Sequence, residues 1–327
     1  MIDQLYGLVH EYPFFALIVG FSALIWSADR FVHASAAAAK NLGVSKIVIG
    51  LTFVAVGTSA PEIVVGLQDS LGGRGQLAIG NAIGSNIANI GLVLGITALV
   101  RPLPFATTTL KREIPWLIGA TALALLCLLD RYLGPLDGLA LLGGLAFLLY
   151  RLARIGRHAG ELPDNIQSEL DELPDMTMVI AGLWFLAALV VLLVSSHLVV
   201  EGAREVALRF GVSEFVVGLT VVAVGTSLPE LSVTVTAVLR GHADMAIGNV
   251  VGSNILNILA VLAVPALLAQ QEIEVAVLWR DYGLMVALTA LLILFAYGIG
   301  SRKIITRFEG AVLVTGWVGY TYLIYHQ

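Results

Sequence analysis

The chain has 327 residues, of which 58% are hydrophobic and 13% are charged, with a mean hydropathy of +0.91 and a formal net charge of −5. Its charged fraction is about half that of an average soluble domain, which excludes an ordinary soluble fold and indicates a protein embedded in a lipid bilayer. No basic cluster resembles a nucleic-acid footprint, so nucleic acid is not an expected partner.

Ten apolar stretches predict an all-α integral membrane protein with ten transmembrane helices. Each stretch is close to the length of about 20 residues that a helix needs to cross a hydrocarbon core of about 30 Å. The stretches lie at residues 13–38, 46–70, 76–99, 111–129, 135–150, 178–208, 213–238, 245–268, 281–298 and 308–325.

The start of the chain lacks the features of a cleavable signal peptide. Residues 1–12 include Asp3 and Glu11 but no Lys or Arg, whereas a secretory signal begins with positive charge. We therefore expect the first helix to remain in the protein. Cys127 is the single cysteine and cannot form an internal disulfide, so its position in an apolar stretch predicts a packing role.

An internal repeat links two of these regions. Residues 50–89 and 218–257 align without a gap at an offset of 168 residues, with 23 of 40 positions identical. The identities include most glycines and polar residues of the motifs, whereas many apolar positions differ. Gly-Thr-Ser-Ala-Pro-Glu at 57–62 recurs as Gly-Thr-Ser-Leu-Pro-Glu at 225–230. Each copy is followed by Gly-Asn-x-x-Gly-Ser-Asn-Ile-x-Asn, which ends at Asn89 and at Asn257.

The similarity extends beyond the motifs and predicts two halves of five helices each. Residues 41–45 match 209–213, and Arg112-Glu113 matches Arg280-Asp281 at the same offset. Because five is an odd number of spans, the second half must enter the membrane in the opposite orientation, which makes an inverted repeat. The predicted organisation is an N-terminal repeat at 1–150 with its motif at 50–89, a cytoplasmic hinge loop at 151–175, and a C-terminal repeat at 176–327 with its motif at 218–257.

The hinge loop begins with three arginines and continues with six acidic residues. The acidic part could bind calcium, but its spacing lacks the glycine that an EF-hand loop requires. A solvated hinge is the favoured interpretation.

The distribution of Lys and Arg predicts that both termini lie outside. With the N-terminus outside, twelve of these residues fall on the cytoplasmic side and five on the other, as the positive-inside rule favours, and Arg30, within the first stretch, is not counted. The cytoplasmic set is Lys40, Lys46, Arg101, Lys111, Arg112, Arg151, Arg154, Arg157, Arg240, Arg302, Lys303 and Arg307; the outer set is Arg74, Arg131, Arg204, Arg209 and Arg280.

Glu62 and Glu230 are the main candidates for function, since a charge at the centre of a membrane helix costs several kcal/mol. On a continuous helix, Thr58 and Ser59 would lie on the same face as Glu62, and Thr226 and Ser227 would repeat this beside Glu230. The prolines before the glutamates lack an N–H, so they are expected to free carbonyls such as those of Ala55 or Gly57 and of Ala223 or Gly225.

The second motif of each half contributes a polar stripe with a spacing of four residues. The stripes are Asn81, Ser85 and Asn89 in the first half and Asn249, Ser253 and Asn257 in the second. Together with the glutamates they form a set of hard oxygen ligands, which suits Ca²⁺ rather than a transition metal. The glycines of these motifs could also serve close helix packing. Asp29 and Glu201 do not match each other in the repeat and are interpreted as helix-end or packing groups.

Two carboxylates also set the charge of such a site. In a medium of low dielectric constant net charge is expensive, and one Ca²⁺, two monovalent ions or two protons would neutralise both carboxylates. A third Na⁺ would leave the loaded site positive and make exchange sensitive to voltage. An empty site with both carboxylates ionised should move poorly from one side of the membrane to the other, which would make exchange obligatory.

These motif pairs resemble the alpha repeats of the sodium/calcium exchanger-like family in the calcium/cation antiporter superfamily, in its compact prokaryotic form. The resemblance implies Ca²⁺ transport coupled to Na⁺, without an enzymatic activity or a cofactor, in the plasma (inner) membrane. It also implies that the first and sixth helices, near 13–38 and 178–208, slide across a fixed core. The implied ion-binding residues are Ala55, Thr58, Ser59, Glu62, Ser85, Asn89, Ala223, Thr226, Ser227, Glu230, Ser253 and Asn257.

The resemblance leaves the coupling ion open. Some family members carry Asp where this chain has Asn89 or Asn257. Proton-coupled relatives share the first motif but usually lack this form of the second, so Na⁺ is preferred over H⁺. Two other classes remain from the residues: a passive cation channel, and an intramembrane hydrolase, which the duplication of every polar group disfavours. The expected partners are Ca²⁺, a monovalent cation and the bilayer, and the oligomeric state is open.

Overall fold

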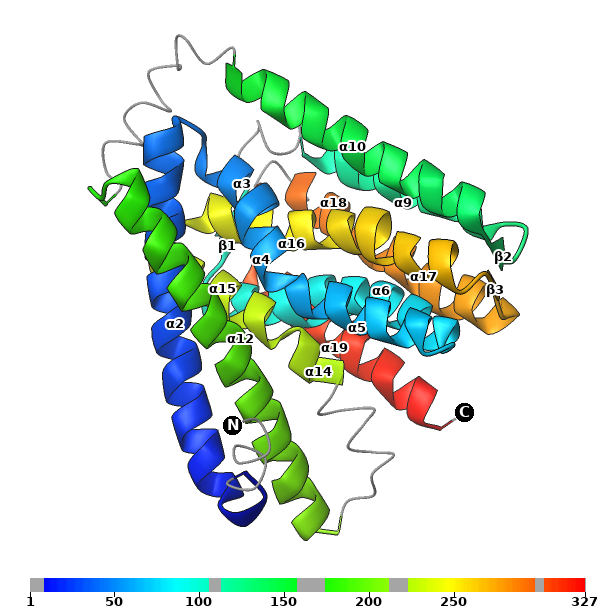
Figure 1. Cartoon of the computed structure of the whole chain (residues 1–327), viewed down its shortest axis with the longest axis horizontal. Coiled ribbons are helices and arrows are strands. Elements are labelled where there is room, and N and C mark those ends of the chain that lie inside the picture. The colour runs from blue at the N-terminus through cyan, green and yellow to red at the C-terminus, as the bar shows by residue number, and fades with distance from the viewer. Residues whose placement is uncertain (1–8, 106–112, 158–173, 212–222, 298–302, 327) are drawn as a thin grey trace.

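The computed structural model describes residues 9–105, 113–157, 174–211, 223–297 and 303–326, and these are mainly helical (Figure 1). The α-helices are α2 (Pro13–Leu42), α3 (Lys46–Ile49), α4 (Ala55–Thr58), α5 (Ala60–Leu71), α6 (Gly75–Ala88), α7 (Gly95–Val100), α9 (Ile114–Leu128), α10 (Pro135–Arg157), α12 (Met178–Arg209), α14 (Ala223–Thr226), α15 (Leu228–Leu239), α16 (Ala243–Leu256), α17 (Ala263–Leu268), α18 (Gly283–Tyr297) and α19 (Arg307–Tyr325). Four π-helical turns, η1 (Gly50–Val54), η2 (Asn89–Leu94), η4 (Asn257–Val261) and η5 (Val277–Tyr282), connect or extend them.

The helices confirm an all-α membrane fold. Within the described ranges, six helices or continuous helical runs are long and apolar enough to cross a bilayer. A seventh candidate is the run from Lys46 to Leu71, which bends by 44° between Thr58 and Ala60. Helices α9 and α15 are apolar but shorter. The count of ten spans stays a prediction. Most of the predicted hinge lies outside the described residues, and so do residues 213–222 of the seventh stretch.

Elements of the first half recur in the second half at the offset of the sequence repeat. The series α4, α5, α6, η2, α7 and β1 (Leu103–Pro104) is followed 168 residues later by α14, α15, α16, η4, α17 and β3 (Gln271–Glu272). Strand β1 pairs antiparallel with β4 (Ile304–Ile305), and β2 (Tyr132–Leu133) pairs antiparallel with β3. Both strand pairs therefore join one half of the chain to the other.

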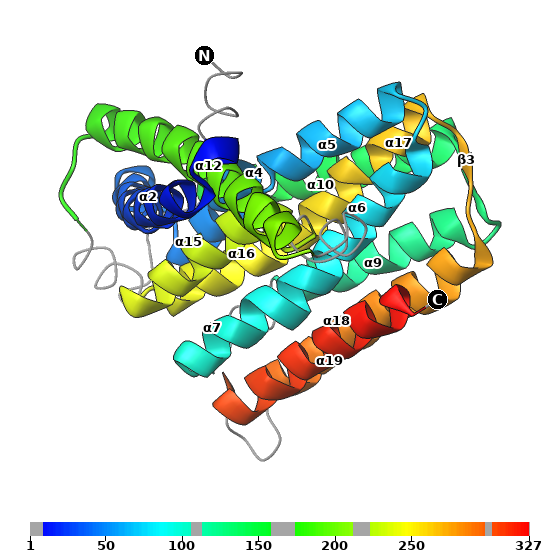
Figure 2. The same cartoon turned by 90° about the horizontal axis from the view of Figure 1, so that it is seen from below.

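The two longest helices, α2 and α12, lie side by side and run in opposite directions (Figures 1 and 2). Near the start of α2, Gly20 packs closely against Val199. Further along α2, the ring of Phe31 lies 4.6 Å from that of Phe185. Since these helices occupy equivalent places in the two halves, equivalent helices run in opposite directions.

The centre of the molecule consists of the runs α6–η2–α7 and α16–η4–α17. Within an apolar window of 18 residues, 78% and 83% of the residues of these runs are buried. The corresponding shares are 39% for α2 and 22% for α12, which lie to one side of the molecule (Figure 2). Helix α16 contacts η1 backbone to backbone. A Cβ atom on Gly50 would lie 2.5 Å from the Met245 carbonyl oxygen, and one on Gly248 would lie 2.5 Å from the Ile47 carbonyl oxygen. This close approach brings the first motif of one half against the second motif of the other.

Candidate functional site

The two glutamates lie immediately after a break in each motif helix. Ser59 and Ser227 separate the paired helices with nearly identical backbone angles, φ −84° and ψ 8° for Ser59 and φ −90° and ψ 4° for Ser227. A proline is the second residue of each following helix, in the first turn, where its missing N–H costs no helical hydrogen bond. Glu62 and Glu230 consequently occupy the first turn of α5 and α15, where the helix dipole favours negative charge.

This break corrects one expectation. Thr58 ends α4 and Ser59 lies in the break, so neither shares a continuous helix with Glu62. Ser59 instead reaches the other half of the chain, and its hydroxyl donates to Glu230 Oε1 over 3.1 Å. Glu62 interacts electrostatically with Glu230 and with the Ser85 hydroxyl. The structure therefore brings Ser59, Glu62, Ser85 and Glu230 together.

Many oxygens of this region have no protein partner. Ser59, Glu62, Glu230, Asn89 and Asn257 are fully buried. Among the described residues, no hydrogen-bond partner is present for either carboxylate oxygen of Glu62, Glu230 Oε2, the hydroxyls of Ser227 and Ser253, or the side-chain amides of Asn89 and Asn257. Buried polar atoms without partners are costly and uncommon. Oxygens in this number, from carboxylates, hydroxyls and amides, form a donor set suited to a hard cation.

The family of the chain follows from comparison with known proteins. The model of the sodium/calcium exchanger protein family matches residues 12–154 and 180–326. The chain belongs to this family. The resemblance carried by the two motif pairs is thereby confirmed, and the family is one of exchangers.

Several relatives match nearly the whole of this family member. It is 44% identical to CaxA of Alkalimonas amylolytica over 94% of this chain and 97% of that protein. It is 37% identical to the inner membrane protein YrbG of Escherichia coli strain K12, over 94% and 95%. The solved sodium-calcium exchanger NCX_Mj, soaked with 10 mM Na⁺ and no Ca²⁺, superposes with a TM-score of 0.78 at 32% identity, covering 94% of this chain and 96% of its own.

Asn81 and Asn249 of this exchanger-family chain have structural partners that the sequence did not predict. Thr58 donates its hydroxyl hydrogen to Asn249 Oδ1 over 3.1 Å, and Asn249 Nδ2 donates to Thr234 Oγ1 over 3.0 Å. In the first half, Asn81 Nδ2 donates to the backbone carbonyl of Glu62 over 3.1 Å. The spacing of the stripes identified both asparagines, but Thr234 carried no signal, because its position in the first half is occupied by Gly66.

The backbone carbonyls near the break differ between the two motifs. The Ala55 carbonyl accepts the N–H of Ser59 over 2.9 Å, so the expectation that the proline would free this carbonyl is wrong. In the second motif, the N–H of Ser227 donates to the backbone carbonyl of Val224, the residue after Ala223, over 3.1 Å. A carbonyl oxygen has two lone pairs. The Thr58 hydroxyl also lies 3.4 Å from this oxygen, so both lone pairs of the Ala55 carbonyl have a donor nearby, and its role as an ion ligand stays a prediction.

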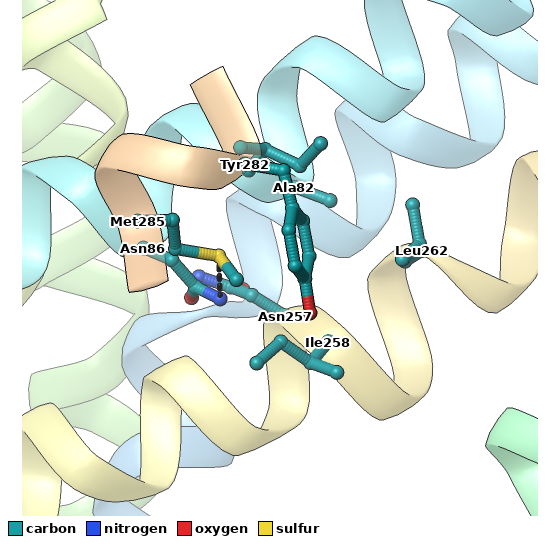
Figure 3. Close-up of a pocket in the computed structure, with 8 residues that line it drawn as sticks. Ala82, Asn86, Asn257, Ile258, Leu262, Tyr282 and Met285 are labelled. Carbon is teal, nitrogen blue, oxygen red and sulfur yellow. Dashed lines mark hydrogen bonds between the residues drawn. The ribbon is translucent and has the colours of Figure 1, made fainter. Parts of the chain in front are cut away.

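Asn89 and Asn257 each begin a π-helical turn, a feature that is frequent at functional sites. Figure 3 shows Asn257 beside Asn86, Tyr282 and Met285 in a small pocket between helices. Asn86 Nδ2 contacts Met285 Sδ over 3.4 Å, and the Tyr282 hydroxyl donates to the Thr121 carbonyl.

Proposed function

We propose that the protein is an antiporter that exchanges Ca²⁺ for Na⁺ by alternating access, with the ions bound at mid-membrane between two repeats. The observation that carries this proposal is the pair of buried glutamates, one from each half, together with other buried motif oxygens that have no protein partner among the described residues. A single divalent cation would neutralise the two carboxylates, and the same oxygens could bind monovalent cations. The solved relative NCX_Mj is named a sodium-calcium exchanger, which supports the choice of ions.

The proposed architecture is ten transmembrane helices in two inverted repeats of five. Support comes from the family model, which matches once in each half, and from the recurrence of breaks and strands at the offset of the repeat. The opposite directions of α2 and α12 support the inversion. Because a relative is named an inner membrane protein, we place this chain in the plasma (inner) membrane, with both termini outside as its Lys and Arg distribution predicts.

The proposed ion ligands are those implied by the motifs. They are Ala55, Thr58, Ser59, Glu62, Ser85, Asn89, Ala223, Thr226, Ser227, Glu230, Ser253 and Asn257. Ala55 and Ala223 would contribute backbone carbonyls and the others side-chain oxygens. Transport requires no enzymatic step and no cofactor in this scheme.

Reconstituted vesicles would test the coupling ion. An outward Na⁺ gradient is expected to drive Ca²⁺ uptake into vesicles that contain the purified protein, whereas an outward H⁺ gradient should not. Uptake with the H⁺ gradient alone would favour the proton-coupled alternative. Uptake that is independent of both gradients would indicate a passive channel and contradict exchange.

Alternating access would require α2 and α12 to move relative to the central helices. Gly57 of the first motif approaches Phe31 of α2 and Leu189 of α12, and Gly225 of the second approaches Val200 of α12. The helix pair thus covers the start of both breaks. An ion pair between Arg240, after α15, and Asp29 of α2 (2.5 Å) joins this pair to the central helices.

Replacing Asp29 by Asn is expected to lower the population of the conformation described above by up to about fivefold, because an exposed ion pair contributes up to about 1 kcal/mol. Distances between spin labels on α12 and α19 would measure this population. Asp69→Asn is the matched control, since Asp69 pairs with Arg74 (2.7 Å) within one helical hairpin. Unchanged distances in Asp29→Asn, or equal changes in both variants, would contradict a role for this pair in the movement.

A further inference from the structure

We propose that Asn249 and Thr234 form a relay that positions the hydroxyl of Thr58, so that a ligand of the first half is oriented by two residues of the second. This inference rests on the proposed function, because it assigns Thr58 to the ion site. It adds Asn249 and Thr234 as positioning residues that the ligand set does not include.

The three residues of the relay are buried and are joined by two hydrogen bonds. Thr58, Thr234 and Asn249 are each 0% exposed. Asn249 Nδ2 donates to Thr234 Oγ1 over 3.0 Å, which leaves Asn249 Oδ1 facing Thr58. Thr58 donates to this oxygen over 3.1 Å. In this arrangement the amide nitrogen of Asn249 meets Thr234 and its oxygen meets Thr58.

The orientation of the Thr58 hydroxyl has a direct chemical consequence. A hydroxyl has one hydrogen and two lone pairs, and only a lone pair can bind a cation. The Thr58 hydroxyl lies within hydrogen-bond distance of Asn249 Oδ1 (3.1 Å) and of the Ala55 carbonyl (3.4 Å), and it also lies near Glu230, so several acceptors compete for its single hydrogen. When a cation lies against Glu230, the hydrogen must point away from it, and Asn249 Oδ1, at 3.1 Å, is a closer acceptor than the Ala55 carbonyl at 3.4 Å. If the amide were reversed, its NH₂ group would instead occupy a lone pair of Thr58.

The first half does not contain the same relay. Gly66 stands at the position equivalent to Thr234, and Asn81 stands at the position equivalent to Asn249. Asn81 donates to the Glu62 carbonyl over 3.1 Å and is partly exposed. The two halves are thus inequivalent around otherwise duplicated ligands. We infer that the Thr58 side of the site is preorganised for its ion by the relay.

Thr234→Val tests the relay, because valine keeps the shape of threonine and removes the hydroxyl. Ca²⁺ binding to the purified protein, measured by isothermal titration calorimetry, is expected to weaken about tenfold, as for the loss of one well-placed hydrogen bond. Thr234→Ser should restore the wild-type Kd. Thermal unfolding of the same samples separates positioning from stability, since the midpoint of Thr234→Val should match that of the control variant below.

Thr97→Val is the matched control. Thr97 is also a fully buried helical threonine, but its hydroxyl donates to the Val93 carbonyl of its own helical run over 2.6 Å. Its replacement is expected to leave the Kd unchanged. A wild-type Kd in Thr234→Val, or an equal weakening in Thr234→Ser, would overturn the relay. The wild-type protein could also bind Ca²⁺ but show no Na⁺-driven uptake. That result would reject the proposed function, and the binding test of the relay would still be valid.

Discussion

Replacing either Glu62 or Glu230 by Gln is expected to reduce Na⁺-driven Ca²⁺ uptake by at least about 100-fold, which corresponds to about 2.8 kcal/mol of ion binding. Glutamine keeps the shape and one oxygen of the side chain but removes the charge. In a fully buried site, the remaining carboxylate can neutralise only half the charge of a Ca²⁺ ion. The measurement is the initial rate of uptake into vesicles at matched protein content.

The control for this experiment is Glu309→Gln. Glu309, like Glu62 and Glu230, lies in the first turn of its helix, where it closes a capping box with Thr306 at the start of α19. Glutamine can also serve in a capping box, so this variant is expected to transport normally. Normal exchange by Glu62→Gln or by Glu230→Gln would reject a site that depends on two carboxylates.

The candidate site residues could be identified from sequence because the duplication marked them twice. Glu62 and Glu230 are isolated charges in apolar stretches, and the spacing of four residues placed Ser85 on the same stripe as Asn89. The structure places Ser85 beside Glu62 and leaves the Asn89 amide buried without a partner in the described residues. Local patterns sufficed here because each helix presents its polar residues on one face.

Contacts between the halves could not be predicted in the same way. The break at Ser59 turns its hydroxyl toward Glu230, although the helical spacing had placed it with Glu62. The bond from Asn249 to Thr234 involves a residue that is glycine in the other half, so the repeat hid it. These features depend on how the helices pack, and helical periodicity describes only one helix at a time.

The same packing explains why a hydrolase is a poor interpretation of the paired glutamates. An intramembrane hydrolase needs one activated nucleophile and distinct acid and base groups. Here Ser59 donates to Glu230, and this contact alone would suit either chemistry. The buried motif oxygens without a partner among the described residues also include those of Ser227, Asn89 and Asn257. Coordination of a cation uses all of these groups, whereas hydrolysis would leave most of them without a role.

Gly252→Ala is expected to disrupt both the fold and the ion site. A Cβ atom on Gly252 would lie 2.5 Å from the Leu51 carbonyl oxygen and 2.8 Å from Ala55 Cβ. Two of the neighbouring atoms belong to the backbone of Leu51, so no flexible side chain can move aside. Helix α16 would have to separate from η1 and α4, at a cost of about 3 kcal/mol. The first motif would then lose its position against the second.

Gly119→Ala provides the matched control for this substitution. Gly119 is an exposed helical glycine, and a Cβ atom added to it would meet no other atom within 4 Å, so alanine should be neutral or stabilise the helix by up to about 1 kcal/mol. Size-exclusion chromatography after heating would measure the folded fraction of each variant, and vesicle uptake would measure exchange. We expect Gly252→Ala to lose both and Gly119→Ala to retain both. A stable, active Gly252→Ala protein would show that the backbone contact between α16 and η1 does not hold the two motifs together.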